Sequence, residues 1–504
     1  MAAVHLIRRA SDLDRALIGR LARGACRVAL APELLAELAA SRAETLADLA
    51  GDQPVYGVNT GMGALAGVRL DAGAQARHQD TLMAGRAVGS APWLTRTEAR
   101  AMLAVRLRTL LHPAAGVSPE LCRHLADLLD ADVIPAVPAR GSGAAGEIIP
   151  LAHLGAAVLG AGQVLDAGGN AVDAGPALAA AGLPRRSFAA KEGVAFLEGV
   201  PGLTGFAVLS GHAARLLIAQ VTVVSAAAQA VLRASRDPLH PALGHGDDEL
   251  LAVLAAHREL RGDGPVRALQ APVSFRVTPA ALAVAMRATD ALDAAAERAL
   301  AGVTDSPAHL DGRFVGTAGF AGTDLVAAHG ALTTALVHLA EVGAARLHRL
   351  LDDRVTGLPR QLSDAPGLHA GMVAVHKRAA GVAHRLRRFA MPALIGAMET
   401  STGQEDVQSF GFEAAECLAE AVAGLRDVLA CELLAVHQAS RLAGPPEGAA
   451  EPLRAALDQV AAVLPDGTGD RPFGRDLDEI IGLLGAGWAR TTPSALAPWS
   501  SRAR

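Results

Sequence analysis

The sequence contains very little lysine, tyrosine or other aromatic residues. Lys191 and Lys377 are the two lysines among 46 basic residues, Tyr56 is the single tyrosine, and aromatic side chains make up 3% of the 504 positions. Strands are typically rich in β-branched and aromatic residues, and few such runs occur here. A net charge of -5 also excludes the broad positive field that favours nucleic-acid binding. We therefore expect a mainly helical protein that does not bind nucleic acid.

Cysteine is scarce as well. The four cysteines are widely scattered without a C-x-x-C pair, which indicates neither a disulfide framework nor a zinc site. The sequence has no H-E-x-x-H motif, and His153 follows Glu147 at a spacing too long for two ligands on one helix face. We predict reduced thiols, a structural role for His153 and no metal.

No segment has the pattern of a targeting signal or a membrane span. The N-terminal MAAVHLIRRASDLDRAL has no apolar core of signal-peptide length, and Asp12 and Asp14 argue against a transit peptide. The most apolar stretch, residues 208–232, contains polar and charged side chains such as Arg215, which is typical of a helix buried in a bundle. We expect a cytoplasmic protein that does not enter membranes.

Helix start signals and long helical stretches predict a bundle. Ser118-Pro119-Glu120 combines a capping hydroxyl, a proline at the first helical position and an early acid. Thr278-Pro279 predicts a helix to about residue 300, and Asp324 is expected to cap one that runs to about 352. The stretches 367–389 and 405–441 exceed the usual helix length and suggest helices that span a whole bundle.

Three glycine-rich loops, at 56–67, 139–150 and 316–324, lie between apolar helical segments, where irregular backbone suggests function. The first loop begins with Tyr56, whose phenol can transfer a proton if a neighbour lowers its pKa. An ordinary loop tyrosine is the simpler interpretation of that residue alone. The loop has neither P-loop nor dinucleotide-binding spacing. We predict a loop-rich region over residues 1–205, with a long-helix bundle and C-terminal helices over 206–504.

Six segments resemble motifs of the histidine and phenylalanine ammonia-lyases, in the order and at about the spacing of that family. They are YGVNTGMG at 56–63, GSGAAGEIIPLAHLGAAVLGAG at 141–162, KEGVAFLEG at 191–199, QAPVSFRVTP at 270–279, PGLHAGM at 366–372 and TSTGQEDVQSFG at 400–411. The resemblance implies an all-α bundle of long helices. It also implies a homotetramer with shared active sites and a small-molecule substrate.

The cofactor segment departs from the family at its central residue. In the family, an Ala-Ser-Gly tripeptide cyclises and loses two waters to form an electrophilic methylidene-imidazolone. Here the matching residues are Ala144-Ala145-Gly146, and alanine has no hydroxyl to eliminate. The resemblance therefore implies that this cofactor is absent. Two alternatives stay open: cyclisation at the upstream Gly141-Ser142-Gly143, and an engineered serine-to-alanine change at position 145.

Other positions in the matching motifs have changed too. Glu198 replaces a family asparagine, and Val273 replaces a second catalytic tyrosine. The polar residues that survive, together with a phenylalanine, are Tyr56, Asn59, Arg276, Phe320, Gln404 and Glu405. By resemblance Asn59 and Phe320 bind substrate, Arg276 holds its carboxylate through two parallel hydrogen bonds, and Gln404 and Glu405 lie near its amine. If buried, Glu198 must be paired, neutral or functional, because an isolated buried carboxylate is costly.

The function expected from these residues is an elimination or addition on a small carboxylate, without the family's cofactor. Tyr56 would be the base, Arg276 the carboxylate anchor, and Glu198 or Glu405 the acid for the leaving group. This chemistry requires an acidic β-proton or a good leaving group. One alternative is a catalytically silent homologue that binds a ligand or a partner enzyme. A second is an ordinary amino acid ammonia-lyase with an atypical cofactor site.

Overall fold

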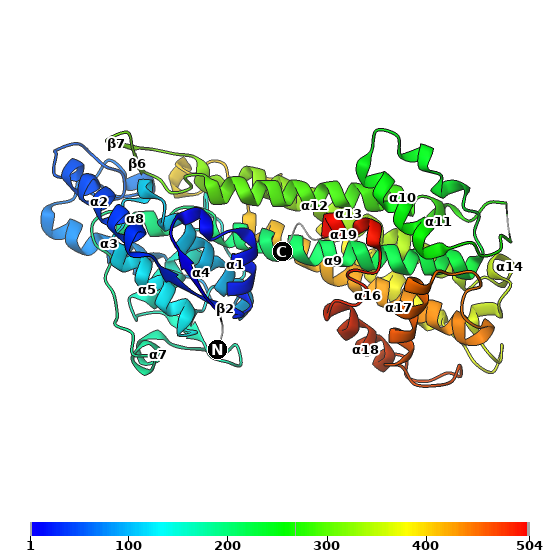
Figure 1. Cartoon of the computed structure of the whole chain (residues 1–504). Helices are drawn as coiled ribbons and strands as arrows, with labels where there is room; N and C mark the ends of the chain where they lie inside the picture. The colour runs from blue at the N-terminus through cyan, green and yellow to red at the C-terminus, as the bar shows by residue number, and fades with distance from the viewer. Residues whose placement is uncertain (1–2, 268, 501–504) are drawn as a thin grey trace. The chain divides into compact units, whose positions relative to one another are not determined.

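The computed structural model describes residues 3–267 and 269–500, which form mainly helices (Figure 1). The chain divides into two compact units. Unit 1 comprises Met1–Leu209, Leu292–His329 and Pro392–Glu416, and unit 2 comprises Ser210–Ala291, Gly330–Met391 and Cys417–Arg504. Each unit thus combines three stretches that are distant in sequence. The division between residues 205 and 206 stays a prediction about the organisation of the chain.

Unit 1 contains eight of the described short helices and small pieces of sheet. The helices are α1 (Arg15–Ala22), α2 (Pro32–Leu49), α3 (Ala72–Arg86), α4 (Arg96–Leu110), α5 (Pro119–Asp130), α6 (Ile148–Val158), α7 (Ala174–Ala180) and α8 (Glu192–Leu197). The strands are β1 (Ala3–Ile7), β2 (Cys26–Leu30), β3 (Ile134–Pro135), β4 (Gln163–Leu165), β5 (Ala171–Asp173), β6 (Ala308–Leu310) and β7 (Arg313–Val315). β1 pairs with β2 in parallel, whereas β3-β4-β5 and β6-β7 are antiparallel.

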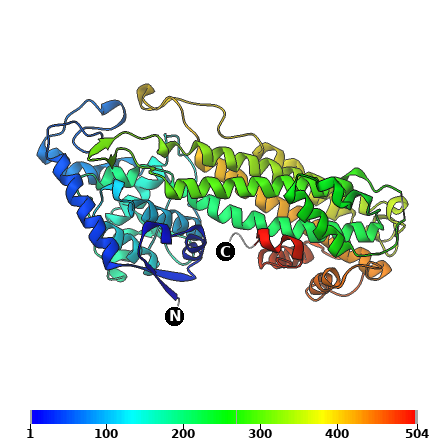
Figure 2. The same cartoon turned by 45° about the horizontal axis from the view of Figure 1, so that its top comes forward.

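Four long helices lie side by side in unit 2 (Figure 2), and each also contributes one end to unit 1. They are α9 (Pro201–Leu232), α12 (Thr278–Ala301), α13 (Thr323–Leu350) and α16 (Gly411–Ala443). Shorter helices complete unit 2: α10 (Asp248–Arg261), α11 (Val273–Arg276), α14 (Asp353–Thr356), α15 (Val373–Leu386), α17 (Glu451–Ala461), α18 (Gly474–Gly485) and α19 (Ala497–Ser500). The predicted all-α bundle of long helices is therefore confirmed.

Two predicted helix starts agree with the structure and one differs by a residue. The Ser118 hydroxyl accepts a hydrogen bond from the Leu121 amide at 3.3 Å and caps α5, and α12 begins at Thr278. The prediction that Asp324 caps α13 was wrong, because that helix begins at Thr323. Asp324 lies in the first turn, where a carboxylate still favours the helix dipole, and pairs with Arg298 at 2.7 Å.

The other two predicted helices begin later than expected. The stretch predicted as 367–389 is helical only from Val373 to Leu386, followed by a 3-10 turn. Before it, the Asp470 carboxylate accepts hydrogen bonds from the Ala370 and Gly371 amides and holds them in a loop. The stretch predicted as 405–441 becomes helical only at Gly411. Helical periodicity could not reveal these loops because long-range and local hydrogen bonds stabilise them.

A buried ion pair links three of the long helices within unit 2. Arg346 on α13 makes two 2.7 Å hydrogen bonds to Glu432 on α16 and a third to the Thr278 hydroxyl at the start of α12. The Arg346 and Glu432 side chains are at most 1% exposed. The bidentate geometry compensates for the cost of removing both charges from water, so the pair fixes how these helices align.

Two described helical segments have the length and apolar composition of a membrane span. They are Glu192–Leu232, with mean hydropathy 1.6 in its most apolar window, and Gly319–Leu350, with 1.4. Within these windows, 89% and 67% of the residues are buried inside the protein. Burial of this kind is typical of core helices, so the composition of the two segments is weak evidence for a membrane span.

Candidate functional site

The loop that begins at Tyr56 is held firmly against α8. Gln79 on α3, which is 1% exposed, donates a hydrogen bond to the Gly57 carbonyl at 3.0 Å and accepts one from the Val194 amide at 3.1 Å. Gly57 has φ +66°, and a Cβ added there would lie 2.8 Å from the Val194 side chain. The Tyr56 hydroxyl accepts a hydrogen bond from the Gly63 amide at 2.9 Å. The loop therefore holds the phenol in one place.

Asn59 contributes to the same loop through its side chain. Its Oδ1 accepts hydrogen bonds from the Val55 amide at 2.7 Å and from Arg69 at 3.1 Å, and its Nδ2 donates to the Gln53 carbonyl at 2.9 Å. Both ends of the amide are thus engaged within the loop. The substrate-binding role expected for Asn59 stays a prediction, and its contacts here support the loop.

The degenerate cofactor segment is contacted directly by a predicted catalytic residue. The Ala145 amide donates a hydrogen bond to Glu405 Oε2 at 2.6 Å, and the Ser401 hydroxyl donates to Glu405 Oε1 at 2.7 Å. Gly146 has φ +88°, and a Cβ there would lie 3.0 Å from the Phe320 carbonyl oxygen. Unit 1 therefore brings Ala145, Gly146, Phe320 and Glu405 together.

The next residue, Glu147, attaches this segment to α9. Its two carboxylate oxygens accept hydrogen bonds from the Gly202 amide at 2.6 Å and the Leu203 amide at 2.7 Å, in the first turn of α9. Burial raises the Glu147 pKa to about 7, although these amides and the Arg106 charge oppose the increase. Amides at a helix start favour a negative charge. The two hydrogen bonds therefore tie Glu147, and with it the preceding Ala144–Gly146 segment, to the start of α9.

The segment does not fit the family's cofactor at position 145. The Ala145 side chain is a methyl group, and the amide of this residue already donates to Glu405. In the alternative tripeptide Gly141-Ser142-Gly143, a Cβ atom added at either glycine would meet nothing within 4 Å. Ser142 itself is half-buried. Its surroundings thus lack the close packing that surrounds Gly146.

Glu198 introduces a buried carboxyl group beside these residues. It is 5% exposed, and no hydrogen bond to its carboxyl group is found among the residues that the structure describes. Burial is the main cause that raises its pKa to about 8; Glu405 and Asp305 add to the increase, while Arg106 and Arg86 oppose it. The Glu198 carboxyl group is therefore mostly protonated at neutral pH and able to donate a proton.

Arg106 fixes the backbone at Glu198. Its guanidinium is fully buried and donates to the Ala195 and Glu198 carbonyl oxygens, both at 2.8 Å. Burial lowers the Arg106 pKa to about 10, which still leaves the group charged. In the same region Lys191 pairs with Asp305 at 3.0 Å. These buried cations hold the chain around Glu198 in position.

The pKa of Tyr56 is raised, mainly by burial and further by the negative charges of Glu198 and Glu405. The Gly63 hydrogen bond and the Arg86 charge partly oppose this increase. The phenol therefore holds its proton at neutral pH, contrary to the condition under which a loop tyrosine is a ready base.

Sequence reasoning did not single out Arg86, the last residue of α3. Its positive charge interacts with Tyr56, Glu198 and Glu405, although burial lowers its own pKa. An arginine within the otherwise apolar and small-residue run TLMAGRAVG was the available signal. Gln79 was missed as well, because only the fold shows which backbone groups it bonds.

The remaining predicted residues are placed differently. Arg276 ends α11 in unit 2, where its Nε donates to the Ala271 carbonyl at 2.9 Å. Gln404 is exposed beside the Thr400–Glu405 bridge in unit 1. The structure therefore groups Gln404 with the Tyr56 loop in one unit and assigns Arg276 to the other. Their substrate-binding roles stay predictions.

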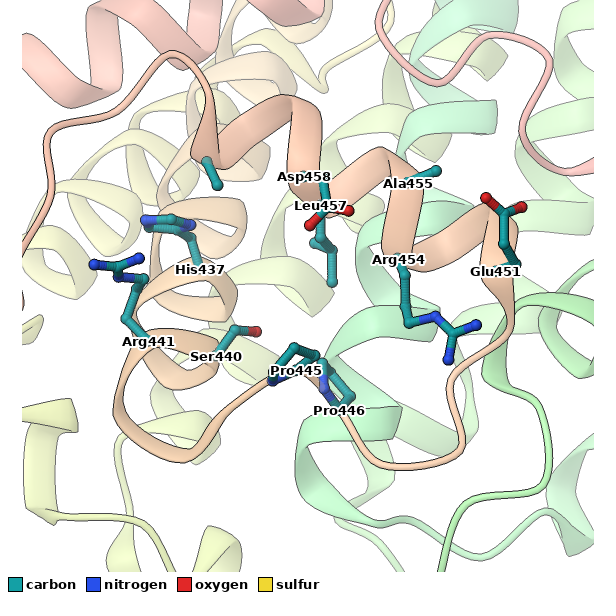
Figure 3. Close-up of a pocket in the computed structure, with 11 residues that line it drawn as sticks. His437, Ser440, Arg441, Pro445, Pro446, Glu451, Arg454, Ala455, Leu457 and Asp458 are labelled. Carbon is teal, nitrogen blue, oxygen red and sulfur yellow. The ribbon is translucent and has the colours of Figure 1, made fainter.

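Unit 2 also contains a surface pocket without any predicted site residue (Figure 3). It encloses about 370 Å³ between the end of α16, the Pro445–Pro446 loop and α17. Arg441 at one end pairs with the exposed Asp466 at 3.2 Å, and Arg454 lies toward the other end. No group of three or more histidine, cysteine or acidic side chains that could hold a metal occurs within residues 3–267 and 269–500.

Comparisons with known proteins place the chain in a family. A family model described as aromatic amino acid lyase matches residues 13–462. The histidine ammonia-lyase of Gloeobacter violaceus is 31% identical over 483 residues, covering 93% of both chains. That of Deinococcus radiodurans is 33% identical over 469 residues, covering 89% of this chain and 88% of the relative.

Solved structures show the same fold. The structure of histidine ammonia-lyase from Trypanosoma cruzi superposes with a TM-score of 0.89 at 25% identity, covering 98% of this chain and 95% of that one. Tyrosine aminomutase from Streptomyces globisporus superposes with a TM-score of 0.90 at 24% identity over 99% of both chains. The second likeness is evidence for the fold alone.

Proposed function

This chain belongs to the aromatic amino acid lyase family, and from that premise we propose that it is a lyase that works without the family's methylidene-imidazolone. The single observation that carries this proposal is the methyl side chain of Ala145, in a segment whose amide is hydrogen-bonded to Glu405 at 2.6 Å. A methyl group has no hydroxyl to leave as water. The electrophile therefore cannot form at this position by the family's route.

The proposed reaction is an elimination or addition on a small carboxylate-bearing or amino-acid-derived substrate. Glu198, with a pKa of about 8, donates a proton to the leaving group at neutral pH. Tyr56 first passes its phenol proton to the Glu405 carboxylate, and the resulting phenolate then takes the β-proton from the substrate. Arg276 binds the substrate carboxylate by resemblance. Asn59, Phe320 and Gln404 complete the proposed binding residues.

The absent electrophile limits the substrate. A β-proton of an unactivated amino acid is too weak an acid for a tyrosine or carboxylate base. The substrate must therefore carry its own activating group beside the proton, or a leaving group better than ammonia. This argument disfavours deamination of histidine or phenylalanine, although the curated relatives named above are histidine ammonia-lyases.

Two other functions have specific support. The names of the relatives favour an ordinary ammonia-lyase, which would need a cofactor formed at an atypical position such as Ser142. The changed residues Glu198 and Val273 favour a silent homologue that binds a ligand or a partner enzyme. The lone Tyr56, held in a rigid loop, is the reason why we favour an active enzyme.

Intact mass and near-ultraviolet absorbance of the purified protein test the proposal first. The cofactor-free proposal requires the mass of the unmodified chain and no absorbance beyond that of its aromatic residues. A mass lower by two waters would instead support an ordinary ammonia-lyase. Substitution Tyr56→Phe then separates the remaining two: it should abolish turnover by an enzyme and leave ligand or partner binding by a silent homologue intact.

We also propose a cytoplasmic homotetramer that binds neither membranes nor nucleic acid. Exposed apolar side chains support association of copies: Met391, Ile395, Met398 and Val407 are each at least 67% exposed in the single chain. Exposed groups of this kind mark protein interfaces. Light scattering coupled to size exclusion should give four times the chain mass. A monomer would refute this part of the proposal.

A further inference from the structure

Arg86 stands at the end of a helix of unit 1 that packs against two other helices. It ends α3, and α3 packs against both α6 and α8. The contacts are close, since Met83 lies against Gly155 of α6 and Gln79 against Gly193 of α8. The Ala144–Gly146 segment directly precedes α6, and Glu198 directly follows α8. The last turn of α3 is thus anchored between the two helices that position the degenerate cofactor segment and the buried carboxyl group.

The guanidinium of Arg86 has no partner of its own among the residues that the structure describes. Neither a hydrogen bond nor an ion pair within 4.0 Å engages it, and its interactions with Tyr56, Glu198 and Glu405 act through space. Arg86 is only partly exposed. By contrast, Arg96 pairs with Asp132 at 2.6 Å, and Arg15 pairs with Asp293 at 2.6 Å.

We propose that Arg86 binds an acidic group of the substrate, and that the substrate carries two acidic groups. The inference rests on the proposed function, in which the substrate already carries one carboxylate. A planar guanidinium with free N–H groups is suited to bind a carboxylate through two parallel hydrogen bonds. A half-buried cation without a partner is also costly, and a bound anion removes that cost.

A second acidic group suits the chemistry of a site without the electrophile. An electron-withdrawing carboxyl group next to the reacting carbon makes its proton more acidic, which is the activation that the proposed reaction requires. The carboxyl groups of Glu198 and Glu405 would repel a dianion if both were ionised and unopposed. The charge of Arg86, together with the proton on Glu198, compensates for that repulsion.

Binding of matched probes to the full-length protein tests the proposal without requiring turnover. The probes are fumarate against crotonate and 4-carboxycinnamate against cinnamate, each a dianion against a monoanion of similar shape. Titration calorimetry at constant ionic strength compares the wild type with Arg86→Gln. The control is Arg77→Gln, which removes an exposed arginine from the same helix. Melting temperatures show whether each variant is folded.

We expect at least one dianion to bind the wild type about tenfold or more tightly than its monoanion, the range of a charged hydrogen bond. Arg86→Gln should remove this preference and leave monoanion affinity unchanged, while Arg77→Gln should preserve the preference. The proposal is overturned if Arg86→Gln keeps the preference for the dianion. It is also overturned if this substitution weakens the binding of the dianion and of its monoanion equally. Arg276→Gln should weaken the binding of all probes and tests the proposed function separately. Failure of the proposed function can therefore be told from failure of the role proposed for Arg86.

Discussion

Glu405 accepts a hydrogen bond from the backbone amide of Ala145 at 2.6 Å, so a predicted catalytic carboxyl group contacts the central residue of the Ala144-Ala145-Gly146 segment. The same carboxyl group accepts a bond from Ser401, and Ser401 lies against Gly63, whose amide binds the Tyr56 hydroxyl. A continuous series of contacts therefore joins the Tyr56 loop to the degenerate segment. The Tyr56 loop and the Ala144–Gly146 segment are therefore parts of one connected group of residues in unit 1.

Restoring the serine tests whether that architecture still supports cyclisation. In Ala145→Ser the tripeptide becomes Ala-Ser-Gly, and Gly146 already has the positive φ of +88° that glycine adopts without strain. We expect the intact mass to fall by two waters and a new near-ultraviolet band to appear.

The control for this experiment is Ser142→Ala, whose intact mass should equal the mass calculated from its own sequence, with no loss of water. An unmodified mass for Ala145→Ser would mean that the segment can no longer bring the Gly146 nitrogen to the Ala144 carbonyl. That result would mean that the backbone conformation, and not only the side chain at position 145, prevents cyclisation.

The contribution of Glu198 to the stability of the protein should fall as pH rises from about 4.5 to about 8. The folded state holds its carboxyl proton up to the raised pKa of about 8, whereas the unfolded chain releases it near 4.5. Within that window the folded state binds more protons, so unfolding becomes more favourable with pH, by at most about 1.4 kcal/mol per pH unit. Above about pH 8 this contribution becomes constant.

Glu198→Gln removes the titrating group while keeping a side chain of the same size. The melting temperature of the wild type minus that of the variant, measured at pH 5, 7 and 9, should therefore decrease as pH rises. Parallel pH profiles of the two proteins would show that Glu198 is ionised in the folded state, and would remove its role as a proton donor.

Glu405→Gln should shift the titration of Glu198. The negative charge of Glu405 is one cause of the raised Glu198 pKa, and the amide of glutamine removes the charge but can still accept a bond from Ala145. The pH at which stability changes should therefore move to a lower value. The measurement is the same melting profile, with Glu405→Gln compared against Glu405→Gln combined with Glu198→Gln, where no shift can remain.

Gly57→Ala should destabilise the Tyr56 loop. At φ +66° an alanine is strained, and its Cβ would lie 2.8 Å from Val194 and 2.9 Å from Met62, so we expect a loss of about 1–3 kcal/mol. Chemical denaturation measures this loss. Gly67→Ala is the matched control in the same loop, because its Cβ would meet nothing within 4 Å, and equal effects of the two changes would contradict the argument.

The residues of this connected group that lie in short motifs could be predicted as site candidates. Tyr56, Ala145, Phe320 and Glu405 were identified from local sequence, and unit 1 brings them together. Arg86 and Gln79 were not identified, since neither forms part of a motif and their importance comes from neighbours distant in sequence. Asn59 was assigned to substrate, whereas its amide is engaged within the loop because Val55, Gln53 and Arg69 surround it.

The sequence by itself determined the helical class, the family motifs and the missing hydroxyl at position 145, because composition, local periodicity and side-chain chemistry do not depend on distant contacts. Only the tertiary structure decided where helices α15 and α16 begin, since hydrogen bonds such as those from Ala370 and Gly371 to Asp470 hold the preceding loops. It also decided the protonation of Glu198, because burial and the charge of Glu405 raise its pKa to about 8. Desolvation exists only once the chain has folded.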